Sequence, residues 1–226
     1  MKKGVNDESL ELPMYGLSEA ALYLRVPIST LDYWVFGRGK TPGLITAASR
    51  HPRTLSFMNL LECHVLAAMR GIYNLKLPKI RQALVQLNSM HGYKHPLVEM
   101  PLFTDRRDIL VREMDKILNY SRPKKFGQYE MPQIMETFLE RIETENKEYK
   151  FYPFVRERLK TEPKLILISP SVGFGKPVIA GTGISTTVIA SRFNARDSIP
   201  DLAKEYGLSR REIEEAIRWE IRTVAA

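Results

Sequence analysis

The stretch that decides the predicted fold is LSEAALYLRVPISTLDYW, residues 17–34. Ser18 is suited to cap a short helix, because its hydroxyl oxygen can accept a hydrogen bond from a backbone N–H of the first turn. Pro27 then interrupts that helix, since proline disfavours helical geometry in the residue before it. Ser29 is expected to cap a second helix, with Asp32 as the acidic member of a capping box. The spacing predicts a helix-turn-helix.

A basic hairpin is predicted after this motif. Strands are expected over 44–48 and 54–58, separated by a turn with basic side chains. Asn59 is expected to cap the next helix, and Pro78 to open a further one. A helix-turn-helix followed by a basic hairpin is typical of a winged helix, whose second helix faces the major groove and whose wing meets the DNA backbone.

The predicted winged helix places candidate DNA contacts on its second helix, in the loop after it and on the hairpin. Hydroxyl groups at the start of a helix can approach phosphates or base edges, and basic side chains on a wing suit phosphates. The candidate contacts are Ser29, Thr30, Tyr33, Trp34, Arg38, Lys40, Arg50, His51 and Arg53. On the helix spacing alone, a plain two-helix corner of a bundle is the alternative interpretation.

Positive charge is concentrated in this part of the chain. The 226 residues include 34 Lys+Arg and 26 Asp+Glu, a net charge of +8, divided as −1 in 1–14, +6 in 15–90, 0 in 91–150 and +3 in 151–226. A basic surplus fits nucleic acid, an anionic membrane or an acidic protein. No apolar run is long enough for a transmembrane helix, and the N-terminus lacks the apolar core of a secretory signal. We therefore expect a cytoplasmic protein without a membrane partner.

Residues 15–90 resemble the DNA-binding domain of the MerR family of regulators. That family has a Leu-x-Tyr-aromatic stretch in the helix-turn-helix, here 31–34, and a Pro-or-Glu-x-Ile-x-x-Ala-Leu pattern in a later helix, here 78–84. Asp32 stands where the family usually has arginine, so the family contact at that position is not carried over. The resemblance implies a DNA-binding winged helix.

A Gly-rich segment, GKPVIAGTGI at 175–184, indicates a different kind of unit. It is not a P-loop, because Lys176 is followed by Pro177 where magnesium binding needs Ser or Thr. The segment resembles the Gly-Lys-Pro-x-Ile-x-Gly-Thr-Arg-Ile signature of the prokaryotic domain of unknown function 433, with Gly183 in place of the arginine. Members of that family are small helix-turn-helix-like units regarded as antitoxins of toxin–antitoxin pairs.

The two resemblances together imply an antitoxin of the VapB type. Such a protein would bind a PIN-like ribonuclease toxin and repress its own operon by binding operator DNA, as a homodimer and as a hetero-oligomer with the toxin. The candidate partner-binding residues are Lys176, Thr182, Arg192, Arg210, Arg211 and Arg218. Mixed charge on the last helix also suits a solvated face. The alternative function is a stand-alone MerR-like transcription regulator.

The expected fold is α+β and mainly α, in four parts. A mobile arm over 1–14 precedes the winged helix at 15–90, a small mixed region at 91–150 and a helical, helix-turn-helix-like domain at 151–226. No nucleophile–base pair or carboxylate pair stands out, so we predict neither catalysis nor a cofactor. The single cysteine, Cys63, cannot form an internal disulfide or a cysteine-based metal cage, and no metal site is predicted.

Overall fold

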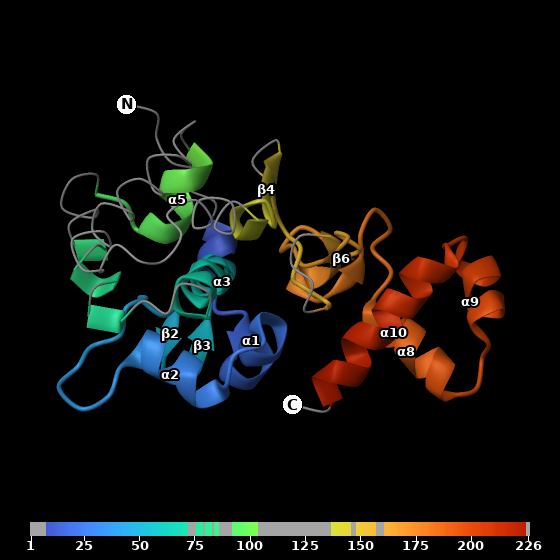
Figure 1. Cartoon of the computed structure of the whole chain (residues 1–226), viewed down its shortest axis with the longest axis horizontal. Coiled ribbons are helices and arrows are strands. Elements are labelled where there is room, and N and C mark those ends of the chain that lie inside the picture. The colour runs from blue at the N-terminus through green and yellow to red at the C-terminus, as the bar shows by residue number, and fades with distance from the viewer. Residues whose placement is uncertain are drawn as a thin grey trace, which may run out of the picture. The chain divides into compact units, whose positions relative to one another are not determined.

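The computed structural model describes residues 8–71, 76–78, 80–82, 84–85, 92–103, 137–145, 148–156 and 161–224. The chain divides into two compact units, 1–140 and 141–226, whereas the sequence predicts boundaries at 90 and 150. Figure 1 shows helices as the main elements of both units, together with short strands. The predicted α+β, mainly α class is therefore confirmed.

The first unit is built around helix α3 (Phe57–Gly71), in which every side chain from 57 to 69 except that of Ala67 is buried. Helices α1 and α5, the short η1 helix and strand β3 all contact α3. In chain order the other elements are η1 (Glu8–Glu11), β1 (Tyr15–Gly16), α1 (Leu17–Leu24), α2 (Ile28–Phe36), β2 (Ser49–Arg50), β3 (Arg53–Leu55) and α5 (Pro96–Phe103).

Helices α1 and α2 form the predicted pair, but neither begins as predicted. Helix α1 follows Gly16 and α2 follows Pro27, and neither of these residues provides a side-chain cap. Ser18 and Ser29 lie inside the first turns instead. Arg25 turns the chain between the helices in a left-handed conformation, with φ of 55°.

The hairpin is shorter and begins later than predicted. Strands β2 and β3 pair antiparallel on either side of His51 and Pro52, and β1 adds a third strand, so that the sheet order is β1-β3-β2. Residues 44–48 were expected to form the first strand, but they form a loop. Their backbone groups bond to other elements: the Leu44 N–H, for example, donates to the carbonyl oxygen of Trp34 at 2.6 Å.

Asn59 is buried inside α3 and ties this loop to the helix. Ser56 and Asn59 cap α3 reciprocally, because each backbone N–H donates to the other's side-chain oxygen at 3.1 Å. The Asn59 Oδ1 also accepts from the N–H of Ala48 at 2.9 Å, and its Nδ2 donates to the carbonyl oxygen of Thr46 at 2.9 Å. Asn59 is thus not the predicted N-cap but the anchor of the loop that leads to the hairpin.

Two further segments of the first unit differ from expectation. Residues 97–103 were predicted as a strand but belong to helix α5, because a short apolar run fits either structure and Pro96 suits a first helical turn. Residues 8–14 were assigned to a mobile arm, yet they contain η1 and bury Leu10. The strand predicted at 109–112 lies outside the described residues.

A buried histidine joins three segments of the first unit. The His95 Nδ1 lies 2.8 Å from a carboxylate oxygen of Glu62, and its Nε2 lies 2.7 Å from one of Glu11, which Lys94 also contacts at 3.0 Å. Burial lowers the pKa of His95, but hydrogen bonds and charge from Glu62 and Glu11 outweigh burial and raise it. Burial raises the pKa of Glu62, against the opposing effect of His95.

The second unit contains two antiparallel strand pairs, three α-helices and the short η3 helix among its described residues. The charged segment 140–150, predicted as a solvated helix face or linker, forms most of the first hairpin instead, whereas the buried strand predicted at 165–168 is confirmed. The elements are β4 (Ile142–Glu145), β5 (Glu148–Phe151), β6 (Ile166–Leu167), η3 (Gly173–Gly175), β7 (Val178–Ile179), α8 (Thr186–Asn194), α9 (Ile199–Tyr206) and α10 (Arg210–Val224).

The predicted ends of the last two helices are confirmed. The Ser198 hydroxyl accepts from the N–H of Asp201 at 3.3 Å, and Gly207 ends α9 with φ of 65°. Ser209 and Glu212 form the predicted capping box of α10, with backbone-to-side-chain distances of 2.7 and 3.3 Å. Helix α10 packs on both α8 and α9.

Replacing Asn59 with alanine is expected to destabilise the first unit by about 2–4 kcal/mol, because it leaves buried backbone groups without their partner. Trp34 and Trp219 are the two tryptophans of the chain. In a Trp219→Phe background, chemical denaturation followed by Trp34 fluorescence therefore reports on the first unit. The exposed Lys40 of the same unit serves as the control position, and equal losses for Asn59→Ala and Lys40→Ala would contradict the anchoring role.

The stability of the first unit is expected to fall as pH rises from 6 to 9. The pKa of His95 is higher in the folded chain than its unfolded value of about 6.5, so its contribution is complete below that pH and is lost as pH rises through the folded pKa. His95→Gln is expected to cost about 3–5 kcal/mol at pH 6 by breaking the buried pair. It should also flatten this pH dependence, while His51→Gln, at an exposed position, should preserve it.

Candidate functional site

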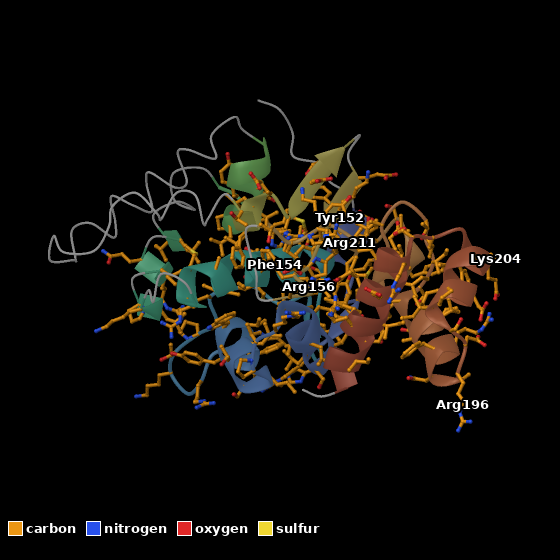
Figure 2. All side chains as sticks on the ribbon, turned by 45° about the vertical axis from the view of Figure 1, so that its right-hand side comes forward. Tyr152, Phe154, Arg156, Arg196, Lys204 and Arg211 are labelled. Atoms are coloured by element: carbon orange, nitrogen blue, oxygen red, sulfur yellow. The ribbon has the colours of Figure 1, made fainter. Side chains whose placement is uncertain are left out.

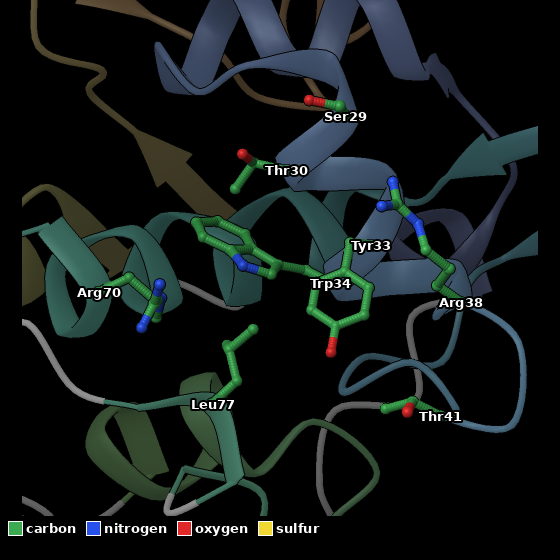
Figure 3. Close-up of a pocket in the computed structure, with 8 residues that line it drawn as sticks. All are labelled: Ser29, Thr30, Tyr33, Trp34, Arg38, Thr41, Arg70 and Leu77. Atoms are coloured by element: carbon green, nitrogen blue, oxygen red, sulfur yellow. The ribbon is translucent and has the colours of Figure 1, made fainter.

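A groove on the first unit gathers the side chains at the start of α2. It has a volume of about 550 Å³ and is shown in Figure 3. Five of the nine predicted DNA contacts line it, from α2 and the loop that follows. The lining residues are Ser29, Thr30, Tyr33, Trp34, Arg38, Thr41, Arg70 and Leu77.

The predicted contacts differ in how far they reach the surface. Ser29 is exposed, Thr30 and Tyr33 are half-buried, and Trp34 is only 3% exposed. Figure 3 shows the Trp34 ring beside Thr30 and the Tyr33 hydroxyl turned toward Thr41. Trp34 can therefore support the groove wall, but its burial leaves little of its ring for an outside molecule.

Two arginines frame the groove, and only one of them was predicted. Arg38 lies in the loop after α2, and Arg70 comes from the last turn of α3. In Figure 3 the two guanidinium groups lie on opposite sides of the Tyr33 and Trp34 rings. From the sequence, Arg70 could be assigned only to the end of a helix, with no indication of its neighbours. Its proximity to α2 depends on how α3 packs, so no local signal could have indicated it.

The loop between α2 and β2 is held in a tight path beside this groove. Arg81 donates to the carbonyl oxygens of Gly43 and Pro42 at 3.1 and 2.7 Å. A Cβ on Gly43 would lie 1.9 Å from the carbonyl oxygen of Val35, so only glycine fits this close approach. Lys40 lies exposed in the same loop.

Arg53 on the hairpin contacts two residues of α2. Its guanidinium binds the carboxylate of Asp32 at 2.5 Å and lies 4.9 Å from the ring centroid of Phe36. Asp32 therefore positions the hairpin, in place of the capping role predicted for it. Arg50 and His51 are exposed at the turn.

The predicted partner-binding residues of the second unit fall into two groups. Three arginines already hold carboxylates of their own unit. Arg192 binds Asp197 and both carboxylate oxygens of Glu205, the latter at 2.8 Å each. Its hydrogen bonds lower the pKa of Glu205. These contacts indicate that Arg192 mainly joins α8 to α9 and is not primarily a residue that binds a partner.

The other two paired arginines lie on α10. Arg210 binds Glu214 at 2.7 Å, and Arg218 binds Glu215, which Arg156 also contacts. Hydrogen bonding and charge from Arg210, with further charge from Arg218 and Arg156, lower the pKa of Glu214. Both pairs leave α10 with a surface of alternating charge.

The remaining predicted residues are exposed. Lys176 and Thr182 lie in the two turns around β7, and Arg211 lies in the first turn of α10. The Thr182 hydroxyl donates to the carbonyl oxygen of Ile179 at 2.9 Å and accepts from the N–H of Ile184 at 3.0 Å, so it also stabilises its turn. Figure 2 labels Arg211 together with Arg196 and Lys204, which are exposed at the end of α8 and on α9.

Two kinds of site are not seen in the described part of the chain. No group of three or more His, Cys, Asp or Glu side chains there is arranged to hold a metal ion. Of the helices that the structure describes, none has the length and apolar character needed to cross a membrane.

Comparison with known proteins finds relatives whose similarity spans both units of this chain. The chain is 26% identical over 244 residues to "Putative antitoxin VapB45" of Mycobacterium tuberculosis (strain ATCC 25618 / H37Rv), an alignment covering 93% of this chain and 97% of that protein. The crystal structure of Rv2018 from Mycobacterium tuberculosis matches with a TM-score of 0.67 and 25% identity, over 91% of this chain and 98% of that one. Residues 166–219 match the family model "Protein of unknown function (DUF433)". The second unit thus contains a segment similar to DUF433, and the chain is similar along nearly its whole length to a mycobacterial protein named as a putative antitoxin.

Proposed function

We propose that this chain is the antitoxin of a type II toxin–antitoxin system. It binds and neutralises a PIN-like ribonuclease toxin through its second unit, and it binds operator DNA through its first unit to repress its own operon. The antitoxin role rests on the similarity to the mycobacterial relative, which extends over 93% of the chain. The DNA-binding role rests on the groove at the start of α2.

The groove offers the chemistry that a DNA backbone requires. Exposed or half-buried hydroxyl groups at Ser29 and Thr30 lie in the first turn of α2, whose N-terminus favours an anion. Arg38 and Arg70 add positive charge on either side. Their guanidinium groups suit phosphate oxygens, because each presents several N–H donors in a planar fork. The first unit therefore acts as a MerR-like winged helix, with the β2–β3 hairpin as its wing.

The protein acts as a homodimer on its operator. Two copies related by a two-fold axis present two α2 helices to the half-sites of a palindrome, so modest contacts are doubled. The same dimer carries two second units for toxin binding. A hetero-oligomer of toxin and antitoxin follows from this arrangement.

Exposed positive charge on the second unit suits a toxin with an acidic active site. Lys176 and Arg211 are both exposed, and no ion pair of Arg211 is found within the described residues. Arg192, Arg210 and Arg218 bind carboxylates of their own unit. The toxin-binding role is assigned chiefly to Lys176, Thr182 and Arg211, because their side chains are exposed.

The combined variant Arg38→Ala and Arg70→Ala is expected to weaken binding to duplex DNA from upstream of the chain's own coding sequence. It should also reduce the slope of log K against log salt concentration by about 1.8, which is about 0.9 for each lost phosphate contact. Fluorescence anisotropy over a range of salt concentrations measures this slope. The matched control is Arg196→Ala with Lys204→Ala, two exposed cations of the second unit. An unchanged slope in the groove variant would remove the groove from DNA binding.

Co-expression with the product of the neighbouring gene tests the antitoxin role. If that product is a PIN-like ribonuclease that arrests growth, the full chain is expected to restore growth and to co-purify with it. Reversing one exposed charge with Arg211→Glu should weaken the complex at least tenfold in a titration, whereas Lys204→Glu should not. Growth arrest that the wild-type chain fails to relieve would favour the stand-alone regulator.

A further inference from the structure

A single acidic residue lies among the candidate DNA contacts of the first unit. Between Glu19 and Glu62 the sequence contains no Asp or Glu except Asp32, and Asp32 is the fifth residue of α2. That position is beyond the first turn, so its carboxylate does not cap the helix. A carboxylate on a surface that binds DNA repels phosphates, so its presence on α2 needs another explanation.

Asp32 and Phe36 hold the guanidinium of Arg53 on α2. The Arg53 Nη1 donates to the Asp32 Oδ1 at 2.5 Å, and the guanidinium carbon lies 4.9 Å from the Phe36 ring centroid. Asp32 and Phe36 are four residues apart, so they lie on the same side of the helix. Asp32 engages one nitrogen of Arg53, whose side chain is 54% exposed, and a guanidinium carries N–H donors on each of its nitrogens. The group is therefore held in one orientation with donors left for a partner.

The guanidinium of Arg53 lies on the outer surface of α2 and not at the tip of the hairpin. Ser29 is exposed and lies three residues before Asp32 and four before Tyr33, so it neighbours both side chains on the helix surface. Tyr33 lines the α2 groove. The Asp32–Arg53 pair and the groove thus lie on either side of Ser29, whereas Arg50 is exposed at the hairpin turn.

The charge of the pair distinguishes between two ligands that a guanidinium can bind. Asp32 and Arg53 together carry no net charge, so a phosphate that is attracted by the guanidinium is repelled by the carboxylate beside it. The edge of a base is neutral and meets no such repulsion. Guanine presents two acceptors in the major groove, O6 and N7, at a spacing that fits the fork of an arginine. The pair therefore suits guanine better than it suits the DNA backbone.

We propose that Arg53 binds O6 and N7 of one guanine in each half-site of the operator, and that Asp32 is the positioning residue that orients its guanidinium. The inference deepens the proposed DNA-binding role of the first unit and rests on it. A guanidinium that is already oriented loses little side-chain entropy when it binds, which favours the base that matches its fork. The proposal therefore names one base pair that this surface selects.

Selection from a pool of random DNA duplexes tests the base contact. The full wild-type chain is expected to enrich a two-fold site, and Arg53→Lys is expected to lose the preference for one guanine in each half-site. Lysine keeps the charge and can still pair with Asp32, but it lacks the fork that binds both acceptors. The matched control is Arg50→Lys, at the position paired with Arg53 across the hairpin, which should retain the preference. An unchanged guanine preference in Arg53→Lys would overturn the proposal.

Methylation of guanine N7 gives a second readout on the selected duplex. Methylation of the contacted guanine is expected to weaken binding of the wild-type chain about tenfold, which is within the discrimination that such a contact provides. The same methylation should leave binding of Arg53→Lys unchanged. An equal loss for both chains would place another residue at that guanine and contradict the assignment.

The role of Asp32 is tested by Asp32→Asn on the selected duplex and on an unrelated one. Binding to the selected duplex is expected to weaken, because the guanidinium loses its orientation, while binding to the unrelated duplex strengthens, because a negative charge is removed. Glu8→Gln is the control, since Glu8 is exposed on η1 and the change in charge is the same. Weaker binding to both duplexes would indicate a purely structural role for Asp32, and tighter binding to both would indicate simple repulsion. Either result would overturn the positioning role.

The selection also separates this proposal from the function on which it rests. If the wild-type chain enriches no sequence, the proposed DNA-binding role and the guanine contact both fail. If it enriches a site whose guanine preference survives in Arg53→Lys, the DNA-binding role stands and the contact is wrong. If Arg53→Lys loses the preference but the site is absent upstream of the chain's own coding sequence, the contact stands without autorepression.

Discussion

The buried amide of Asn59 is the contact on which the shape of the first unit depends. Its oxygen accepts from two backbone N–H groups and its nitrogen donates to a carbonyl, so the loop after α2 is joined to the first turn of α3. A buried polar group of this kind is stable only when its partners are in place. The hairpin then begins where the loop ends, and Arg53 meets Asp32 on α2.

The roles of the basic residues follow from their exposure and their ion pairs, and not from the net charge of +8. Arg81 holds backbone carbonyls, Arg53 holds Asp32, and Arg192 joins α8 to α9. These cations maintain the two folds. The two proposed binding roles are assigned to different surfaces, the α2 groove of the first unit and the exposed turns of the second.

Local chemistry accounts for the predictions that are confirmed. Ser198 and the Ser209–Glu212 capping box mark the last two helices, because a cap is formed by residues three apart in sequence. The apolar run at 165–168 similarly marks a buried strand. Where predictions were wrong, as at 44–48 and 97–103, the deciding contacts come from distant parts of the chain or the pattern fits two structures.

The sequence by itself determined the helix pair at 17–36, the DUF433 signature around 175–184 and the mainly helical class, since each depends on short-range spacing. Only the tertiary structure brought Arg70 to the α2 groove and His95 between Glu62 and Glu11. It also brought the Arg53 guanidinium from the hairpin to Asp32 and Phe36 on α2. Such features arise from packing between residues far apart in the chain, and no local pattern of residue types encodes which distant partners will meet.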